Sequence, residues 1–188
     1  IFQIIKKIKI GDAFQRKITI PEGLTSNEII DIIKKTEGIV LNQEGYKQIE
    51  EGTLFPSTYF YIYGTNSNII INNMKKRMKS TLIKAWQNKD KDLDLNNYND
   101  VLILASIIEK ETSLNYEKSR IAQVLLNRLR LNMKLQSDPT VIYGIENELG
   151  IKKKELTKND LNHKSNFNTY LVYGLPQGPI CNPGKESI

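Results

Sequence analysis

The segment that decides the fold reads Val101-Leu-Ile-Leu-Ala-Ser-Ile-Ile-Glu-Lys-Glu-Thr112. It is apolar on almost every side of a helix, which is typical of a helix buried in a protein core. Two carboxylates, Glu109 and Glu111, conflict with that burial. Because each residue of an α-helix turns by about 100°, these side chains lie about 200° apart and point in different directions. The segment therefore predicts a buried helix whose two carboxylates have different surroundings.

Glu109 is the candidate for catalysis, because helical geometry places it between Leu102 and Ala105. Desolvation among apolar side chains favours the protonated form of a carboxyl, which can then donate a proton. Glycosidases with two carboxylates need them roughly 5 to 10 Å apart across one bond, an arrangement that diverging faces of one helix do not readily supply. The pattern therefore favours a mechanism with one carboxylate. The alternative from the helix alone is an ion pair between Glu109 and an arginine: Arg120, Arg128 or Arg130.

Upstream of this helix, the sequence predicts strands and a first helix. Alternating residues over 16–20 predict a strand that ends in a Pro-Glu-Gly turn. An isoleucine-rich helix is expected to begin after a cap at Thr25 or Ser26 and to end at Gly38. Aromatic and β-branched residues over 59–63 predict a second strand.

Further helices are predicted on both sides of the central one. Apolar residues at helical spacing predict a long amphipathic helix over 67–86 and another over 117–131. Asn99 or Asp100 is expected to cap the central helix, and turns are expected from Gln136 onward. Together with the strands, these helices predict an α+β fold.

Composition narrows the possible partners. The 188 residues are 39% hydrophobic, which suits a folded core, and the net charge of +6 favours an anionic partner. The lysine-rich groups lack interleaved aromatic residues, so no nucleic-acid partner is expected. The longest apolar run covers eight residues, whereas a membrane-spanning helix needs about twenty. A single cysteine, Cys181, and a single histidine, His163, argue against a disulfide and a metal site, and no cofactor is expected.

Several blocks downstream of the central helix gather neutral hydrogen-bonding groups. Amides, hydroxyls and aromatic faces in one cleft suit a polyhydroxylated, N-acetylated sugar. The alternative is that these side chains only cap turns and loops. The blocks are Asn127-Arg-Leu129, Leu135-Gln-Ser-Asp-Pro-Thr-Val-Ile-Tyr-Gly144, Phe167-Asn-Thr-Tyr170 and Gly174-Leu-Pro-Gln-Gly-Pro-Ile180.

Four more blocks belong with these: Leu104-Ala-Ser-Ile-Ile-Glu-Lys-Glu-Thr112, Asn182-Pro-Gly184, Thr19-Ile-Pro-Glu-Gly-Leu-Thr25 and Glu51-Gly-Thr-Leu-Phe-Pro-Ser-Thr-Tyr59. In order and spacing, the blocks resemble the signature segments of the YceG/MltG-like family of endolytic murein lytic transglycosylases. The resemblance covers nearly the whole chain. Three positions depart from the family pattern: Asn166 and Phe167 stand where the family usually has proline and tyrosine, and Gln177 stands where it has proline.

The resemblance implies a domain order and a location. A small LysM-like region over 1–50 would precede a mixed α/β catalytic domain over 51–188 that is truncated at its C-terminal end. A single helix ahead of residue 1 would anchor the protein in the cell (inner) membrane, with the catalytic domain on the periplasmic or extracytoplasmic side. The implied partners are peptidoglycan glycan strands and the peptidoglycan synthases of the elongation machinery.

The resemblance also implies an activity, because Glu109 matches the family's catalytic residue. Glu109 would protonate the oxygen between N-acetylmuramic acid and N-acetylglucosamine and then act as base on the muramoyl C6 hydroxyl, leaving a 1,6-anhydro end that terminates a nascent strand. No water is added, so such an enzyme is a lyase. The alternative is a non-catalytic module that binds cell-wall glycan. The resemblance assigns substrate binding to Asn127, Gln136, Ser137, Asp138, Thr140, Tyr143, Asn168, Thr169 and Tyr170.

Overall fold

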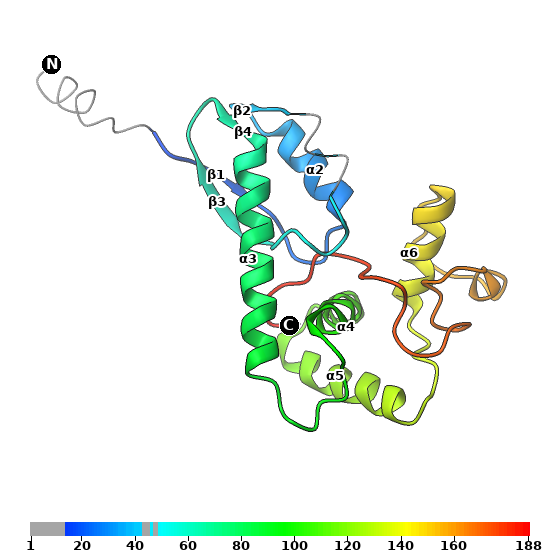
Figure 1. The fold of residues 1–188 in the computed structure, drawn as a ribbon. Coiled ribbons are helices and arrows are strands. Elements are labelled where there is room, and N and C mark those ends of the chain that lie inside the picture. The colour runs from blue at the N-terminus through cyan, green and yellow to red at the C-terminus, as the bar shows by residue number, and fades with distance from the viewer. Residues whose placement is uncertain (1–13, 43–45, 47–48) are drawn as a thin grey trace, which may run out of the picture.

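The computed structural model describes residues 14–42, 46 and 49–188, and within them every strand precedes residue 67 (Figure 1). The predicted LysM-like region therefore lies partly outside the described residues. The fold is α+β, as the sequence predicted. Its elements are β1 (Arg16–Thr19), α2 (Ser26–Lys35), β2 (Ile39–Val40), β3 (Thr58–Tyr61), β4 (Thr65–Asn66), α3 (Ser67–Gln87), α4 (Tyr98–Glu111), α5 (Asn115–Arg130), α6 (Asp138–Leu149) and the 3-10 helix η2 (Asp160–Asn162).

Two small sheets form the N-terminal part. β1 and β3 are antiparallel, and β2 and β4 are parallel. Ile18 of β1 pairs with Tyr59 of β3, and both side chains are buried against the same core. The strand predicted over 59–63 therefore begins one residue earlier and ends two residues earlier than expected.

The helix α2 has the predicted start. Thr25 is its N-cap and forms a capping box with Glu28: the Thr25 hydroxyl accepts from Glu28 N, and the Glu28 carboxylate accepts from Thr25 N at 2.9 Å. Ile29 and Ile33 are fully buried one turn apart, which holds the helix on the core shared with β1 and β3.

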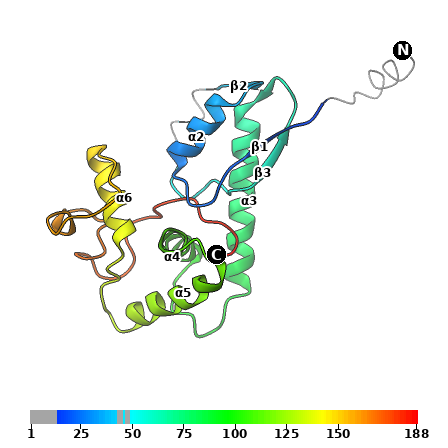
Figure 2. The same cartoon turned by 180° about the vertical axis from the view of Figure 1, so that it is seen from behind.

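The long helix α3 connects the two halves of the molecule, and Figure 2 shows it running beside both. Near its start, Ile70 and Met74 belong to the core under β1 and β3. Farther along, Met78 and Leu82 pack against Leu102 of α4. One continuous helix therefore fixes the N-terminal sheets relative to α4.

The second core lies between α4 and α5. Ile107 of α4 is completely buried there, and Leu125 is the most buried hydrophobic residue of α5. Val124, which the sequence placed on the buried face of this helix, is 49% exposed. The buried stripe runs through Ile121, Ala122 and Leu125 instead, and residue 124 lies to one side of it.

Two predicted boundaries are wrong. Asn97, not Asn99 or Asp100, caps α4. Its side-chain oxygen accepts from the backbone N–H groups of Asn99 and Asp100 in the first turn. Turns were expected from Gln136 onward, but the structure has the helix α6 there, over twelve residues. The turn-forming residues mark its ends: Pro139 lies in the first turn and Gly150 ends the helix in a left-handed conformation.

The side chain of Asn182 joins the C-terminal segment to the N-terminal part. It is fully buried, and its oxygen accepts from Leu54 N at 2.7 Å. Its Nδ2 lies 3.0 Å from both Leu24 O and Glu51 Oε1. Backbone bonds from Gly23 N to Asn182 O and from Asn182 N to Leu24 O complete the junction.

Glu51 is the acidic partner in this junction. Its Oε1 accepts from Ser26 N at 2.8 Å, Gly52 N at 3.1 Å and Asn182 Nδ2 at 3.0 Å. Burial raises the pKa of the Glu51 carboxyl above its ordinary value, and hydrogen bonds, chiefly from Ser26 and Gly52, offset part of the rise. The folded protein therefore holds this proton more readily than the unfolded chain does.

Replacing Asn182 by alanine should lower the free energy of unfolding by about 2–4 kcal/mol, because it leaves Leu54 N without its acceptor and removes one of the donors to Glu51. Urea unfolding followed by circular dichroism measures the loss. Asn72→Ala, on the exposed side of α3, is the control and should change stability by at most about 0.5 kcal/mol. Equal losses in the two variants would contradict the role of the junction.

Glu51→Gln should remove the contribution of Glu51 to the pH dependence of stability. Because the folded pKa is raised, the contribution of Glu51 to stability is fully present below the ordinary glutamate value of about 4.3 and is lost as the pH rises through the folded value. Glutamine keeps one oxygen for the same donors. The stability of the variant relative to the wild type should therefore increase as the pH rises from 4.5 to 8. Melting temperatures across this range test it, and a constant difference between the two proteins would refute it.

Candidate active site

Glu109 lies in the last turn of α4, and its side chain is only 7% exposed. Lys118 of α5 faces it with 4% exposure, and its Nζ lies 3.3 Å from both carboxylate oxygens. Taking such a pair out of water is costly unless further hydrogen bonds satisfy it. The remaining donors around Glu109 therefore decide what the carboxylate can do.

The C-terminal segment over 182–188 supplies two of these donors. Gly184 N lies 2.9 Å and Ser187 Oγ 2.6 Å from Glu109 Oε2. Within the described part of the chain, Oε1 accepts from Lys118 alone. Oε2 therefore accepts from three donors: Lys118 Nζ, Gly184 N and Ser187 Oγ. Oε1 is the oxygen with capacity left for a substrate.

The alternative that Glu109 forms an ion pair is correct, but its partner is a lysine and not one of the predicted arginines. Lys118 holds Glu109, whereas Arg128 donates to the backbone oxygen of Leu135. Lys118 precedes Ile121 by three residues and Leu125 by seven, so it extends the buried stripe of α5. That spacing was a sequence signal for a buried lysine.

A second carboxylate approaches the same lysine from the N-terminal part. Glu22, in the turn after β1, places Oε2 at 4.0 Å from Lys118 Nζ, and its side chain is 47% exposed. Burial and the nearby charge of Glu109 raise the pKa of Glu22. The block Thr19–Thr25 contains Glu22, but no property of its sequence indicated that it would meet a helix so far along the chain.

Glu111, the second glutamate of α4, has a separate set of partners. Glu111 accepts a hydrogen bond from Ser137, at the start of α6. Next to Ser137, Asp138 accepts from the hydroxyl of Tyr170 at 2.6 Å, and this bond raises the pKa of Tyr170 to about 12. The two carboxylates therefore have different surroundings, as the sequence predicted.

Three of the predicted substrate-binding residues are completely buried: Thr140, Asn168 and Thr169. The hydroxyls of Thr140 and Thr169 lie 2.9 Å apart, and Thr169 Oγ1 accepts from Ser137 N. Asn168 Nδ2 donates to the backbone oxygens of Leu161 and His163. These contacts suit residues that hold the loops in place.

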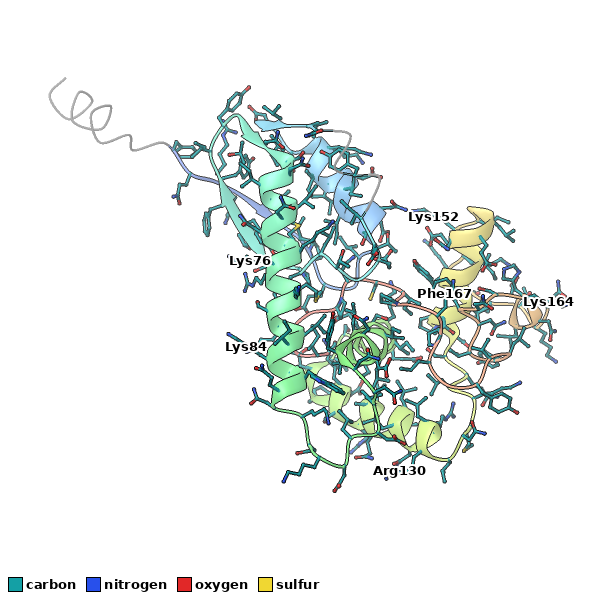
Figure 3. The ribbon with its side chains drawn as sticks, viewed as in Figure 1. Lys76, Lys84, Arg130, Lys152, Lys164 and Phe167 are labelled. Carbon is teal, nitrogen blue, oxygen red and sulfur yellow. The ribbon has the colours of Figure 1, made fainter. Side chains whose placement is uncertain are left out.

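Of the other candidates, Ser137 is also buried and the rest retain accessible surface. Gln136 is exposed and has a φ of 51°, a left-handed backbone that non-glycine residues rarely adopt. Asn127 is exposed on α5, where it accepts from Gln123. Tyr143 donates to Glu51 at 3.5 Å and meets Phe167 edge to face, with ring centres 4.8 Å apart. Figure 3 shows Phe167 beside α6.

Basic side chains lie on several elements. Figure 3 labels Lys76 and Lys84 on α3, Arg130 at the end of α5, and Lys152 and Lys164 near α6. These five side chains do not gather on a single face of one element.

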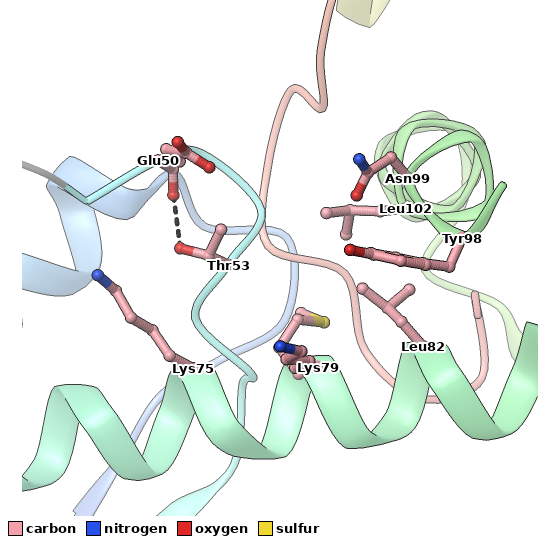
Figure 4. Close-up of a pocket in the computed structure, with 9 residues that line it drawn as sticks. Glu50, Thr53, Lys75, Lys79, Leu82, Tyr98, Asn99 and Leu102 are labelled. Atoms are coloured by element: carbon pink, nitrogen blue, oxygen red, sulfur yellow. Dashed lines mark hydrogen bonds between the residues drawn. The ribbon is translucent and has the colours of Figure 1, made fainter.

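A hollow of about 400 Å³ lies between α3, α4 and the loop over 50–53 (Figure 4). Lys75 and Lys79 of α3 face Tyr98 and Asn99 of α4 across it. Glu109 is not among its lining residues, so this space is separate from the carboxylate described above.

With this geometry in view, comparison with known proteins decides the family. The model of the YceG-like family matches residues 1–188. The chain belongs to the YceG-like family. The resemblance inferred from the sequence blocks is thereby confirmed.

The YceG-like chain is similar to two proteins named endolytic murein transglycosylase. It is 37% identical to the one from Bacillus subtilis, over 98% of this chain and 51% of that protein. It is 30% identical to the one from Streptococcus pneumoniae serotype 2, over 97% of this chain and 33% of that protein. The chain thus spans about half or less of these relatives.

A crystal structure of a yceG-like protein from Listeria monocytogenes has the same fold. The TM-score is 0.71 at 32% sequence identity, and the match covers 98% of this chain and 69% of that one. Among the described residues, no cluster of histidine, cysteine and acidic side chains has the composition of a metal site. No helix in the same residues is both long and apolar enough to span a bilayer.

Lys118→Met should lower the free energy of unfolding by about 3–5 kcal/mol, because Glu109 would stay buried without its cation. In the double variant Glu109→Gln/Lys118→Met the loss should be smaller, because no unpaired charge remains. A double-mutant cycle from urea unfolding measures the coupling between the two side chains. Lys76→Met, exposed on α3, is the matched control, and purely additive losses at Glu109 and Lys118 would contradict the ion pair.

Proposed function

We propose that the protein carrying this chain is an endolytic peptidoglycan lytic transglycosylase in which Glu109 is the catalytic acid and base. One observation carries the proposal: a buried carboxylate is held by Lys118, Gly184 N and Ser187 Oγ, and its Oε1 retains capacity for a proton transfer. The names of the relatives from Bacillus subtilis and Streptococcus pneumoniae support the same activity. Since the chain spans only part of them, the proposal concerns the whole protein.

The reaction needs one group that first gives and then takes a proton. Protonated Glu109 donates to the oxygen that links C1 of N-acetylmuramic acid to N-acetylglucosamine, and the C1–O bond breaks. The carboxylate then accepts the proton of the muramoyl C6 hydroxyl while that oxygen bonds to C1. The strand ends in a 1,6-anhydro sugar, Glu109 recovers its proton, and no water is consumed.

Lys118, Gly184 and Ser187 fit the second half of this cycle. All three donate to the carboxylate, and hydrogen bonds to a charged acceptor are stronger than those to a neutral one. They stabilise Glu109 after it has given up its proton. Fixed donors of this kind lower the barrier because they require no rearrangement during the reaction.

Contacts to the glycan come from residues beyond α4. Asn127, Gln136, Asp138, Tyr143 and Tyr170 keep exposed surface and offer amide, carboxylate and phenol groups to a sugar. Ser137, Thr140, Asn168 and Thr169 are buried, and their role in this proposal is to hold those groups in place.

The proposal extends to domain order, location and partners. A LysM-like N-terminal region precedes the catalytic domain, and the whole protein is anchored in the cell membrane with its catalytic domain outside the cytoplasm. There it acts with peptidoglycan synthases and terminates nascent strands. The family membership supports these statements, which concern the whole protein.

Glu109→Gln should lower the rate of peptidoglycan cleavage by the whole protein at least about 100-fold, the lower end of what acid–base catalysis contributes. Digestion of purified peptidoglycan, followed by mass analysis of the fragments, measures both rate and product. Wild-type products should carry 1,6-anhydro ends. Products with ordinary reducing ends would refute the lyase mechanism.

Glu111→Gln is the matched comparison, because this carboxylate is on the same helix and glutamine can still accept from Ser137. We expect it to keep most of the activity. If wild type and Glu109→Gln both bind glycan and neither releases fragments, the chain is a non-catalytic binding module and the proposed activity is wrong.

A further inference from the structure

Glu22 reaches the proposed catalytic site from a different part of the fold. It lies in the Pro21–Gly23 turn that follows β1, whereas Glu109 belongs to α4. Figures 1 and 2 both show the C-terminal segment passing between the N-terminal sheets and α4, and this segment carries Gly184. The site is therefore assembled from three separate stretches of the chain.

Lys118 is shared by two carboxylates. Its Nζ is 3.3 Å from Glu109 Oε2 and 4.0 Å from Glu22 Oε2. With only 4% of its side chain exposed, the lysine has little water to solvate it, so these acids provide most of its stabilisation. One ammonium cannot neutralise two carboxylates.

Gly184 separates the two acids. Its N–H donates to Glu109 at 2.9 Å, while a methyl group in place of its hydrogen would overlap the Glu22 carboxylate. Only glycine at this position lets Glu22 lie against the peptide that binds Glu109. Glycine at position 184 therefore leaves room for the flexible end of the half-exposed Glu22 side chain beside this peptide.

Other charged groups lie near Glu22 and Glu109. Lys110 of α4 donates to Gly23 O at 3.3 Å, and Glu186 of the C-terminal segment adds a further negative charge near Glu22. The pKa of Glu22 is raised by burial first and by Glu109 second, and Lys118 lowers it. Glu22 and Glu109 therefore repel each other, with Lys118 as the cation that both carboxylates approach.

We propose that Glu22 is a positioning residue for the Glu109 acid: it holds Lys118 between two carboxylates and places a second negative charge beside that acid. The inference rests on the proposed function and deepens it. Glu22 itself is half exposed, so its carboxylate is in contact with water as well as with Lys118.

The test is the pH dependence of peptidoglycan cleavage by the whole protein and by Glu22→Gln. Removing the charge should lower kcat more than it changes KM, and should move the alkaline limb of the pH–rate profile to lower pH by on the order of one unit. Glu22→Asp keeps the charge and should restore much of the wild-type profile. A uniform loss at every pH would indicate only a structural role and would overturn the proposal.

Two further variants isolate the contact itself. Glu37→Gln removes an equal charge from the same part of the chain, where Glu37 pairs with Arg16 at 3.4 Å, and should leave the profile unchanged. Gly184→Ala displaces the Glu22 carboxylate without removing it and should shift the alkaline limb in the same direction as Glu22→Gln. An unshifted profile in both Glu22→Gln and Gly184→Ala would refute the inference.

A readout without substrate separates this inference from the proposed function. Carboxyl-carbon NMR of the folded protein follows the titration of Glu109 directly, and Glu22→Gln should move that titration to lower pH. If Glu109→Gln retains full cleavage, the proposed function fails, yet the NMR shift can still be present. If Glu109→Gln is inactive and Glu22→Gln leaves the Glu109 titration unchanged, only the role of Glu22 is wrong.

Discussion

The buried amide of Asn182 is the constraint on which the arrangement of the site depends. Its oxygen and nitrogen bind Leu54, Leu24 and Glu51, so the C-terminal segment is tied to the N-terminal part at one position. Two residues later, Gly184 donates to Glu109, and three residues after that Ser187 does the same. A shift of the segment at Asn182 would carry both donors away from the carboxylate.

Much of the fold could be predicted from hydrophobic spacing. The helix expected over 67–86 matches α3 almost residue for residue, because its apolar stripe is long and unbroken. The start of α2 was recognisable from Thr25 and Glu28, whose side chains cap each other. The helix α6 was missed because Ser, Asp, Pro and Gly form helix ends as readily as isolated turns, and residue type alone does not distinguish the two.

The site was predictable only in part, for a different reason. Glu109 stood out as a carboxylate in an apolar helix, and Lys118 could have been found as a charge on the buried stripe of α5. Glu22 and Ser187 offer no such signal, because an exposed turn and a terminal serine look ordinary until the chain folds. Their contacts depend on tertiary structure, which local periodicity does not contain. The LysM-like assignment, the boundary near residue 50 and the substrate-binding roles stay predictions.

The position of Ser187 has a consequence for how the site comes into existence. Its bond to Glu109 spans 78 residues of sequence, and the Gly184 bond spans 75. Closing so long a loop costs chain entropy before the contact is made, so local folding of α4 alone does not form these bonds. A newly made or partly folded chain would therefore contain the glutamate without its fixed donors. Completion of folding is therefore the step that brings these donors to Glu109.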